Sequence, residues 1–419
     1  MHKSFILFLL INFSVFQFGI SQVESIDIRR GNEYFEKGFY QEAIRHYSYA
    51  LKANKSLFVL ERLSDCYFKL RNFKEAEGFF YEAYKKFSLD DPQKLKYAIL
   101  LKMNGKFKSS GQLLFSLQSS GSLDKKYIQN LVASFDSIRY WKEKVTYNVS
   151  NIKGINSRNT ETSPVLRGDS LVFASNKEGV IIRKKSKMDG LPFFNLYVAS
   201  VDKEFKIGKP TTFSKVINSP FHESSASFAK NGSIIYFTRC GENLYINDTV
   251  KRMKLYASVK SENGWVQPHT FIMNDSTYSF AHPSVEKDEK MVFFASDMKG
   301  GYGGTDIYVC IQVEDSIWSD PINLGPVINS PGNESYPFYH EDGSLYFSSD
   351  YHLGMGGYDI FVAEQRNGDW VKIKNLGFPI NSTYDDMGIY FNKDKSRGYL
   401  SSNRPGGKGK EDIYLIEKK

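Results

Sequence analysis

Cysteine is scarce in this sequence of 419 residues, which contains only Cys66, Cys240 and Cys310. Their spacing matches no metal-binding or redox motif, so the sequence gives no reason to expect a zinc site or a thiol–disulfide exchange site. An odd number leaves at least one thiol unpaired, and we expect the three to act as small buried hydrophobic residues. The sequence leaves open whether Cys240 and Cys310 form a disulfide bond.

Long hydrophobic runs are missing after the first twenty residues. Residues 5–18 are mostly apolar, follow Lys3 and lead into the small residues Gly19 and Ser21. This order is typical of a secretory signal peptide, which we assign to residues 1–21. The run is short for a membrane span of about 20 residues, and an uncleaved anchor is the alternative. We therefore expect an exported protein of the periplasm or the periplasmic face of the outer membrane.

Neither sign of charge dominates the chain. It has 55 basic and 47 acidic residues, which are interleaved, and a net charge of +8. A nucleic-acid-binding domain would gather its basic residues in one patch or motif, so we expect no nucleic-acid partner. The length favours two domains, and an aromatic content of 15% favours a strand-rich one.

Residues 22–144 contain three copies of a helical repeat of 33 or 34 residues. The copies are visible at residues 34–43, 67–76 and 101–110. In each copy a small residue is followed four positions later by a large one, as in Ala43 and Tyr47. The pattern resembles tetratricopeptide repeats, which implies an α-solenoid, and residues 125–144 are expected to cap it. Partner binding on its concave face and a role as a rigid spacer both remain open.

Residues 145–419 repeat a second motif with a period of 53 residues. A strand ending in serine is followed ten residues later by Asp-Ile-Tyr or Asp-Ile-Phe, three times. Two degenerate copies precede these, at residues 171–197 and 235–256. Four short strands for each period predict a five-bladed β-propeller, with six blades as the alternative. The fold class is therefore α + β and multidomain, an α-solenoid followed by a propeller.

The last propeller unit lacks its outer strand, and a matching segment lies before the first unit. We predict that residues 146–152 pair with the C-terminal strand and close the ring. Such closure removes exposed strand edges.

The repeated serine and aspartate residues have two possible roles, metal binding and turn stabilisation. One aspartate for each blade does not supply the six to eight converging oxygens that Ca²⁺ requires. We therefore predict no metal site and assign these side chains to hydrogen bonds with backbone N–H groups of the glycine-rich loops. The residues concerned are Ser296, Asp306, Ser349, Asp359, Ser402 and Asp412.

The first two blades carry longer, basic loops, and long loops on a rigid scaffold often bind partners. A basic loop without a ligand is the alternative. The candidate partner-binding residues are Arg183, Lys184, Lys185, Lys187, Lys251 and Arg252.

The blade motif resembles the PD40, or WD40-like, repeat. Helical repeats followed by such a propeller are similar to envelope proteins of Bacteroidota, including OmpA-family proteins and components of type IX secretion and gliding. The resemblance implies a protein–protein interaction scaffold with other envelope proteins as partners. The chain ends at Lys419, after the last blade, so we expect no direct peptidoglycan anchor.

Enzyme motifs are not found in the sequence. None of its seven histidines falls in a G-x-S-x-G, H-E-x-x-H or Cys/His motif. The adjacent acids Asp385 and Asp386 would point to opposite faces of a strand. We expect no catalytic residue and no cofactor. The alternatives to a scaffold are a carbohydrate- or peptide-binding propeller and a propeller-based hydrolase.

Overall fold

A computed structural model describes most of the chain, and all structural statements below concern the described residues. These are residues 25–177, 185–186, 188–202, 204–240, 252–271, 277–315 and 317–419. The predicted signal peptide lies outside them. None of the described helices combines the length and apolar character needed to cross a bilayer.

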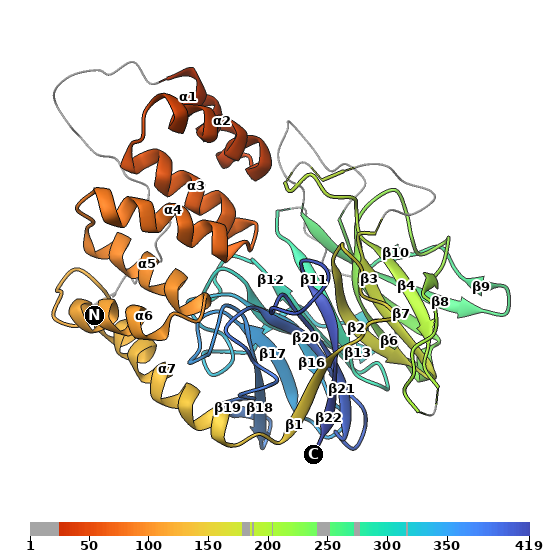
Figure 1. The fold of residues 1–419 in the computed structure, drawn as a ribbon. Helices are drawn as coiled ribbons and strands as arrows, with labels where there is room; N and C mark the ends of the chain where they lie inside the picture. Colours follow the sequence, from red (N-terminus) through yellow and green to blue (C-terminus); the bar gives the residue numbers. More distant parts are fainter. Residues whose placement is uncertain are drawn as a thin grey trace.

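The N-terminal part is a stack of helices that lies against one side of the β-domain (Figure 1). Its core follows the predicted alternation of small and large residues. A Cβ added to Gly31 would lie 2.5 Å from the Tyr47 ring, and Ser64 Oγ donates a hydrogen bond to Ala76 O at 2.8 Å. The helices form three antiparallel pairs, α1–α2, α3–α4 and α5–α6, and α7 packs on the last pair. Their bounds are α1 Ile26–Glu36, α2 Tyr40–Ala53, α3 Leu57–Lys69, α4 Phe73–Lys86, α5 Asp91–Met103, α6 Phe107–Leu117 and α7 Lys125–Glu143.

The β-domain is a five-bladed propeller, as predicted. Each blade is an antiparallel sheet whose innermost strand is its first. Blade 1 contains β2 Glu161–Arg167, β3 Ser170–Ser175, β4 Asn195–Ser200 and β5 Thr211–Thr212. Blade 2 contains β6 Glu223–Ala229, β7 Ile234–Cys240, β8 Met253–Ser261, β9 Gly264–Trp265 and β10 His269–Thr270. Blade 3 contains β11 Phe280–Val285, β12 Met291–Ser296, β13 Asp306–Glu314, β14 Ile317–Trp318 and β15 Ile322–Asn323. Blade 4 contains β16 Glu334–Tyr339, β17 Leu345–Ser349, β18 Asp359–Arg366 and β19 Asp369–Asn375, and blade 5 contains β20 Asp386–Phe391, β21 Arg397–Ser402 and β22 Asp412–Lys418.

The predicted closure of the ring is confirmed. Strand β1, Tyr147–Asn151, pairs antiparallel with β22 and is the fourth strand of blade 5 (Figure 1). Tyr147 lies opposite Lys418 and Asn151 lies opposite Tyr414. Tyr147 and Val149 pack on the hydrophobic core between blades 4 and 5, so the closure is apolar as well as hydrogen-bonded.

A short motif, which we call the blade clasp, joins neighbouring blades. It consists of an asparagine, the serine that follows it and an acid four residues later. Asn381 shows the first half, because its side chain accepts from Ile360 N at 2.7 Å and donates to Ile360 O at 2.8 Å, as a strand neighbour would. The four clasps are Asn156–Ser157–Glu161, Asn218–Ser219–Glu223, Asn329–Ser330–Glu334 and Asn381–Ser382–Asp386. In blade 3 Phe280 replaces the acid.

The clasp acids are buried at the start of the inner strands. Glu334 accepts hydrogen bonds from Ser330 N at 2.7 Å, Ser330 Oγ at 2.5 Å and Ser349 Oγ at 2.6 Å. Glu223 accepts the corresponding two hydrogen bonds from Ser219, and its third donor is Arg239 Nε at 2.8 Å. Burial raises the pKa of Glu334 to about 8 and that of Glu223 to about 7. The neighbouring guanidinium of Arg239 opposes this rise at Glu223.

This difference predicts opposite effects of the same substitution in two blades. The pKa of Glu334 is raised above its ordinary value of 4.5, so its contribution to stability is complete below pH 4.5 and is lost as the pH rises through 8. Glu334→Gln resembles the protonated acid and should be at least about 1 kcal/mol more stable than the wild type at pH 9, but not at pH 5. Urea unfolding at both pH values measures this.

Glu223→Gln is the matched control, because it leaves Arg239 buried without its partner. It should destabilise the protein at both pH values, by about 3 kcal/mol. Equal pH dependence of the Glu334→Gln variant and the wild type would contradict the assignment.

Candidate functional site

The five inner strands surround a central channel and share an irregularity at its waist. One residue of each strand, two positions after the first, has a positive φ. The backbone register of the blade shifts beside this residue, as in a β-bulge. The five are Ser163, Ser225, His282, Tyr336 and Gly388, with φ between 39° and 60°. Four of them are not glycine, and such left-handed residues are uncommon and gather where a structure over-determines them.

The bulged residues meet one another and fill the waist. The rings of His282 and Tyr336 stack at 3.7 Å, and Ser163 Oγ lies 2.9 Å from Ser225 Oγ. A Cβ added to Gly388 would lie 3.4 Å from Ser163 Cα, so the fifth position has little room for a side chain. Burial lowers the pKa of His282 to about 3, and its Nδ1 has no hydrogen-bond partner among the described residues. His282 is therefore a neutral ring at physiological pH.

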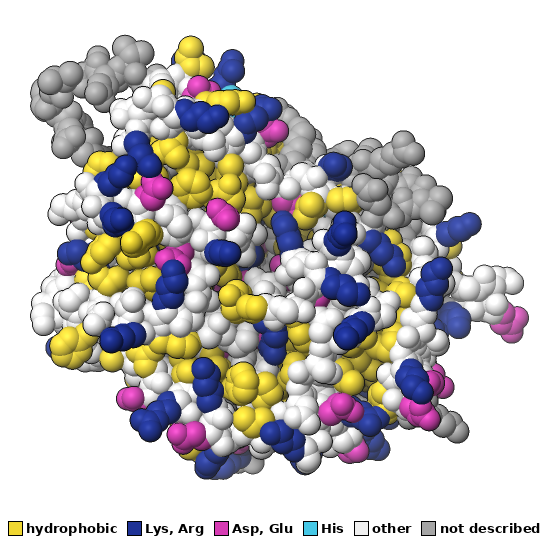
Figure 2. Space-filling view, in the orientation of Figure 1, with side chains coloured by type: hydrophobic (Ala, Val, Ile, Leu, Met, Phe, Trp, Pro, Cys, Tyr) yellow, Lys and Arg dark blue, Asp and Glu magenta, His cyan; other side chains and the backbone are white. Residues whose placement is uncertain are grey.

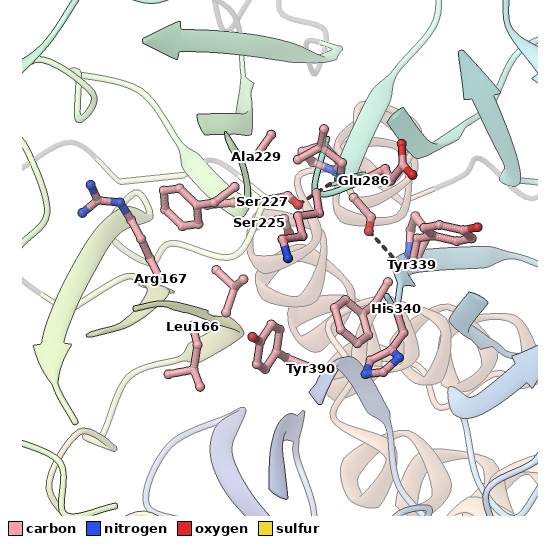
Figure 3. Close-up of a pocket in the computed structure, with 18 of the residues that line it drawn as sticks. Leu166, Arg167, Ser225, Ser227, Ala229, Glu286, Tyr339, His340 and Tyr390 are labelled. Carbon is pink, nitrogen blue, oxygen red and sulfur yellow. Dashed lines mark hydrogen bonds between the residues drawn. The ribbon is translucent and has the colours of Figure 1, made fainter. Parts of the chain in front are cut away.

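A cavity of about 630 Å³ lies in the channel, on the side of the waist where the inner strands end (Figure 3). Its wall combines apolar side chains such as Leu166 with tyrosine, serine and charged residues. Val285 N donates to Ser227 Oγ at 3.0 Å and Tyr339 N donates to Ser284 Oγ at 2.9 Å, so serines satisfy backbone groups between blades. The helices lie behind the cavity in this view, which looks into it from the opposite side.

The other end of the channel is covered by the helical repeats, through Arg71. Arg71 Nη2 lies 2.8 Å from Asp385 Oδ1, and its guanidinium lies 4.6 Å from the centre of the Tyr358 ring. The Asp385 side chain has no exposed surface. Burial raises the pKa of Asp385, and that of the nearby Glu411, while Arg71 opposes both shifts. Arg71 therefore compensates buried negative charge of the propeller from a different domain.

The position of Arg71 in the repeat is unusual. It follows the first helix of its pair and has a φ of 59°, in the left-handed region. The corresponding residues of the other two repeats are Gly38 and Gly105, with φ of 73° and 72°. Glycine is favoured at this position because it has no Cβ. Arginine is found only in the repeat that reaches the channel.

Other contacts hold the two parts together, mainly on blade 4. Lys102 Nζ donates to Gly354 O at 2.9 Å and interacts with the Asp359 carboxylate; burial lowers the pKa of Lys102 and raises that of Asp359. The rings of Tyr127 and Tyr351 stack at 5.0 Å. Trp141 of α7 packs on Gly377, where an added Cβ would lie 3.0 Å from the indole.

The repeated serine and aspartate residues lie in the glycine-rich loops and the strands beside them. Asp306 accepts from the backbone N–H groups of Tyr302 at 2.6 Å and Gly303 at 3.1 Å. Asp359 accepts from Met355 and Gly356, and Asp412 from Lys408 and Gly409, in the same way. Ser296 Oγ donates to Ser279 O, and Ser349 Oγ donates to the Glu334 carboxylate. Ser402 Oγ accepts hydrogen bonds from Arg404 N and Nε. Among the described residues no group of three or more His, Cys, Asp or Glu side chains could hold a metal ion.

The basic loops are described only in part. Arg183, Lys184, Lys187 and Lys251 lie outside the described residues. Lys185 is exposed, and Arg252 pairs with Asp297 of the next blade at 2.7 Å. The grouping of these six residues into one binding surface therefore stays a prediction.

Cys66 and Cys310 lie in separate hydrophobic cores, and Cys240 is half-buried. Cys66 and Cys310 are buried, and burial raises the pKa of both thiols to about 12. No disulfide bond joins Cys240 and Cys310 in the described part of the chain.

Sequence reasoning missed Arg71, the clasp acids and the bulged residues. Two of these left a signal in the sequence. Arg71 aligns with Gly38 and Gly105, and an acid follows the recurrent Ile-Asn-Ser by four residues in four of the five units. The bulges leave a weaker one, because Pro164, Pro283 and Pro337 each follow a bulged residue.

Comparisons with known proteins find no matching family model and no matching curated protein. Solved structures that resemble the chain include a putative TolB from Agrobacterium tumefaciens, at 14% identity and a TM-score of 0.37, covering 61% of this chain and 77% of that one. An endo-arabinase from Bacteroides thetaiotaomicron matches at 15% identity and a TM-score of 0.42, and the match covers 64% of this chain and 96% of that one. A family 117 glycoside hydrolase from Zobellia galactanivorans matches at 13% identity and a TM-score of 0.43, and the match covers 65% of this chain and 90% of that one.

Proposed function

We propose that this protein is a non-enzymatic scaffold of the bacterial cell envelope, exported by its N-terminal segment and binding other envelope proteins. The observation that carries the proposal is the contact between Arg71 and Asp385, which covers the channel end where buried carboxylates gather. Asp385 pairs with Arg71 of the helical repeats, and Glu411 accepts a hydrogen bond from Thr160, so these acids stabilise the architecture.

The arrangement suits a scaffold because two repeat domains are held in one orientation. Lys102, Tyr127 and Trp141 contact the propeller from three places on the helices. Each domain keeps other surfaces for partners. Figure 2 shows hydrophobic side chains exposed on the stacked helices, among charged residues of both signs.

Affinity capture tests the proposal. The chain from residue 22 is immobilised and incubated with envelope extract after mild cross-linking, and bound proteins are quantified by mass spectrometry. We expect specific partners that bind the wild type and bind less to Arg71→Gly, which removes the contact of the helices with Asp385. Recovery of no envelope protein above a bead control would contradict the scaffold role.

A second candidate is a carbohydrate- or peptide-binding propeller, which the 630 Å³ channel cavity favours. Its volume lies within the ~300–1,000 Å³ that is typical of small-ligand sites. Turnover of glycosides or peptides in an activity screen would instead favour the hydrolase alternative.

A further inference from the structure

A second cavity of about 630 Å³ lies on the helical repeats, and we call it the arm groove. Residues of α4, α5 and α6 and of the turn before α6 line it, and no propeller residue takes part. The residues used below are Glu77, Tyr81, Tyr84, Tyr97, Lys106 and Gln112.

Tyrosine rings form the wall of the arm groove. Tyr81 and Tyr84 keep 46% and 44% of their surface exposed, although large aromatic side chains usually bury more. Tyr97 is 5% exposed and its ring centre lies 5.1 Å from that of Tyr84. Among the described residues nothing hydrogen-bonds its hydroxyl. Burial and the charge of Glu77 raise the pKa of Tyr97 to about 12, so the phenol stays protonated and can donate.

The floor of the arm groove carries an ion pair that departs from the repeat. Glu77 is 7% exposed, at a position that holds Ile44 in the first repeat and Gly111 in the third. Lys106 Nζ lies 2.9 Å and 2.7 Å from its two carboxylate oxygens. Burying a carboxylate costs free energy even when it is paired, so an apolar residue here would be the simpler way to pack the helices.

The charges around the arm groove select the class of ligand. A cation would be repelled by Lys106 and by Lys85, which lies 5.3 Å from the centre of the Tyr81 ring. An anion would be repelled by Glu77. A peptide that adds as a strand needs free backbone groups, which the interiors of three continuous helices do not offer. A peptide that binds as an amphipathic helix needs an apolar groove, whereas this one carries the Glu77–Lys106 ion pair. A neutral sugar has C–H faces that pack on aromatic rings and hydroxyls that bond to carboxylate, ammonium and amide groups such as Gln112.

We propose that the arm groove is a binding site for a neutral oligosaccharide, stacked on Tyr81 and Tyr84 and hydrogen-bonded to Glu77, Lys106 and Tyr97. The site is separate from the propeller channel and does not depend on the proposed scaffold function.

Isothermal titration of the chain from residue 22 tests the proposal. The probes are maltotriose, cellotriose, mannotriose and triacetylchitotriose, with trigalacturonate and trilysine as charged comparators. We expect at least one neutral trisaccharide to bind with a Kd of ~1 mM or below. Tyr84→Ala should weaken it at least tenfold, and Glu77→Gln should weaken it several-fold. Tyr49→Ala is the matched control, since Tyr49 is 51% exposed on α2 outside the groove.

Three results would overturn the proposal. They are no binding of any neutral probe, binding that Tyr84→Ala affects no more than Tyr49→Ala, and tighter binding of a charged comparator. Thermal melting of both tyrosine variants checks that they remain folded.

Discussion

Replacing Arg71 with alanine should lower the free energy of unfolding by about 3–5 kcal/mol, the range for a buried pair that loses one partner. The cause is Asp385, whose fully buried side chain would lose the guanidinium 2.8 Å away that compensates its charge. The variant also loses the stacking of that guanidinium on Tyr358. Chemical denaturation measures the loss, and limited proteolysis between α7 and β1 should show earlier release of the helices.

Three companion variants isolate the cause. Arg71→Gly places at this position the residue of the other two repeats, so it relieves the left-handed backbone while removing the same pair, and it should still be destabilised. Arg71→Lys should be intermediate, because it keeps the charge but not the planar stacking. Asp385→Asn in the Arg71→Ala background should recover part of the loss.

Arg139→Ala is the surface control, because Arg139 is 86% exposed in its pair with Glu143 and should change stability by less than about 1 kcal/mol. Equal unfolding curves for Arg71→Ala and the wild type would show that the channel contact does not stabilise the protein.

Opening the ring should have an effect of similar size. Proline at both Asn148 and Ser150 removes two N–H groups that face β22. Alternate residues of β1 turn toward β22, because Ile152 N donates to Ile413 O at 3.2 Å and Lys419 N donates to Thr146 O at 3.0 Å. We expect a loss of at least about 3 kcal/mol and a melting temperature lower by roughly 6 °C or more. Differential scanning calorimetry measures both.

The open ring should also associate, because β22 then presents an unpaired edge. Light scattering should detect oligomers of the proline variant below its melting temperature. The control is Ser150→Ala, at an exposed position of the same strand. A monomeric proline variant with wild-type stability would contradict a role for β1 in closure.

The repeats made the fold accessible from the sequence. The period of 33 or 34 residues predicts the helical pairs, and the period of 53 residues predicts the blades. Both predictions work because each repeated unit packs locally. Closure by β1 followed from the outer strand missing from the last unit. The helical pairs, the blades and the closure all belong to the repeats, and sequence periodicity predicts only features that repeat.

The contact between the domains could not be predicted in this way. It joins Arg71 in the second helical repeat to Asp385 in the last blade, and neither side chain belongs to a repeated motif. The bulge at Tyr336 leaves only the weak signal of Pro337, because its backbone conformation depends on four other strands around the channel. The arm groove was missed because it lies where Glu77 departs from the helical repeat.

The pairing of β1 with β22 has a kinetic consequence. The two strands lie at opposite ends of the propeller sequence, so the ring closes only when the last strand to be made reaches one of the first. Loop closure over such a distance slows folding, and until then blade 5 has three strands. A chain emerging from a ribosome or a translocation pore would therefore fold its helices and four complete blades before β1 can pair with β22 and close the ring. That interval is when a chaperone would have most to bind.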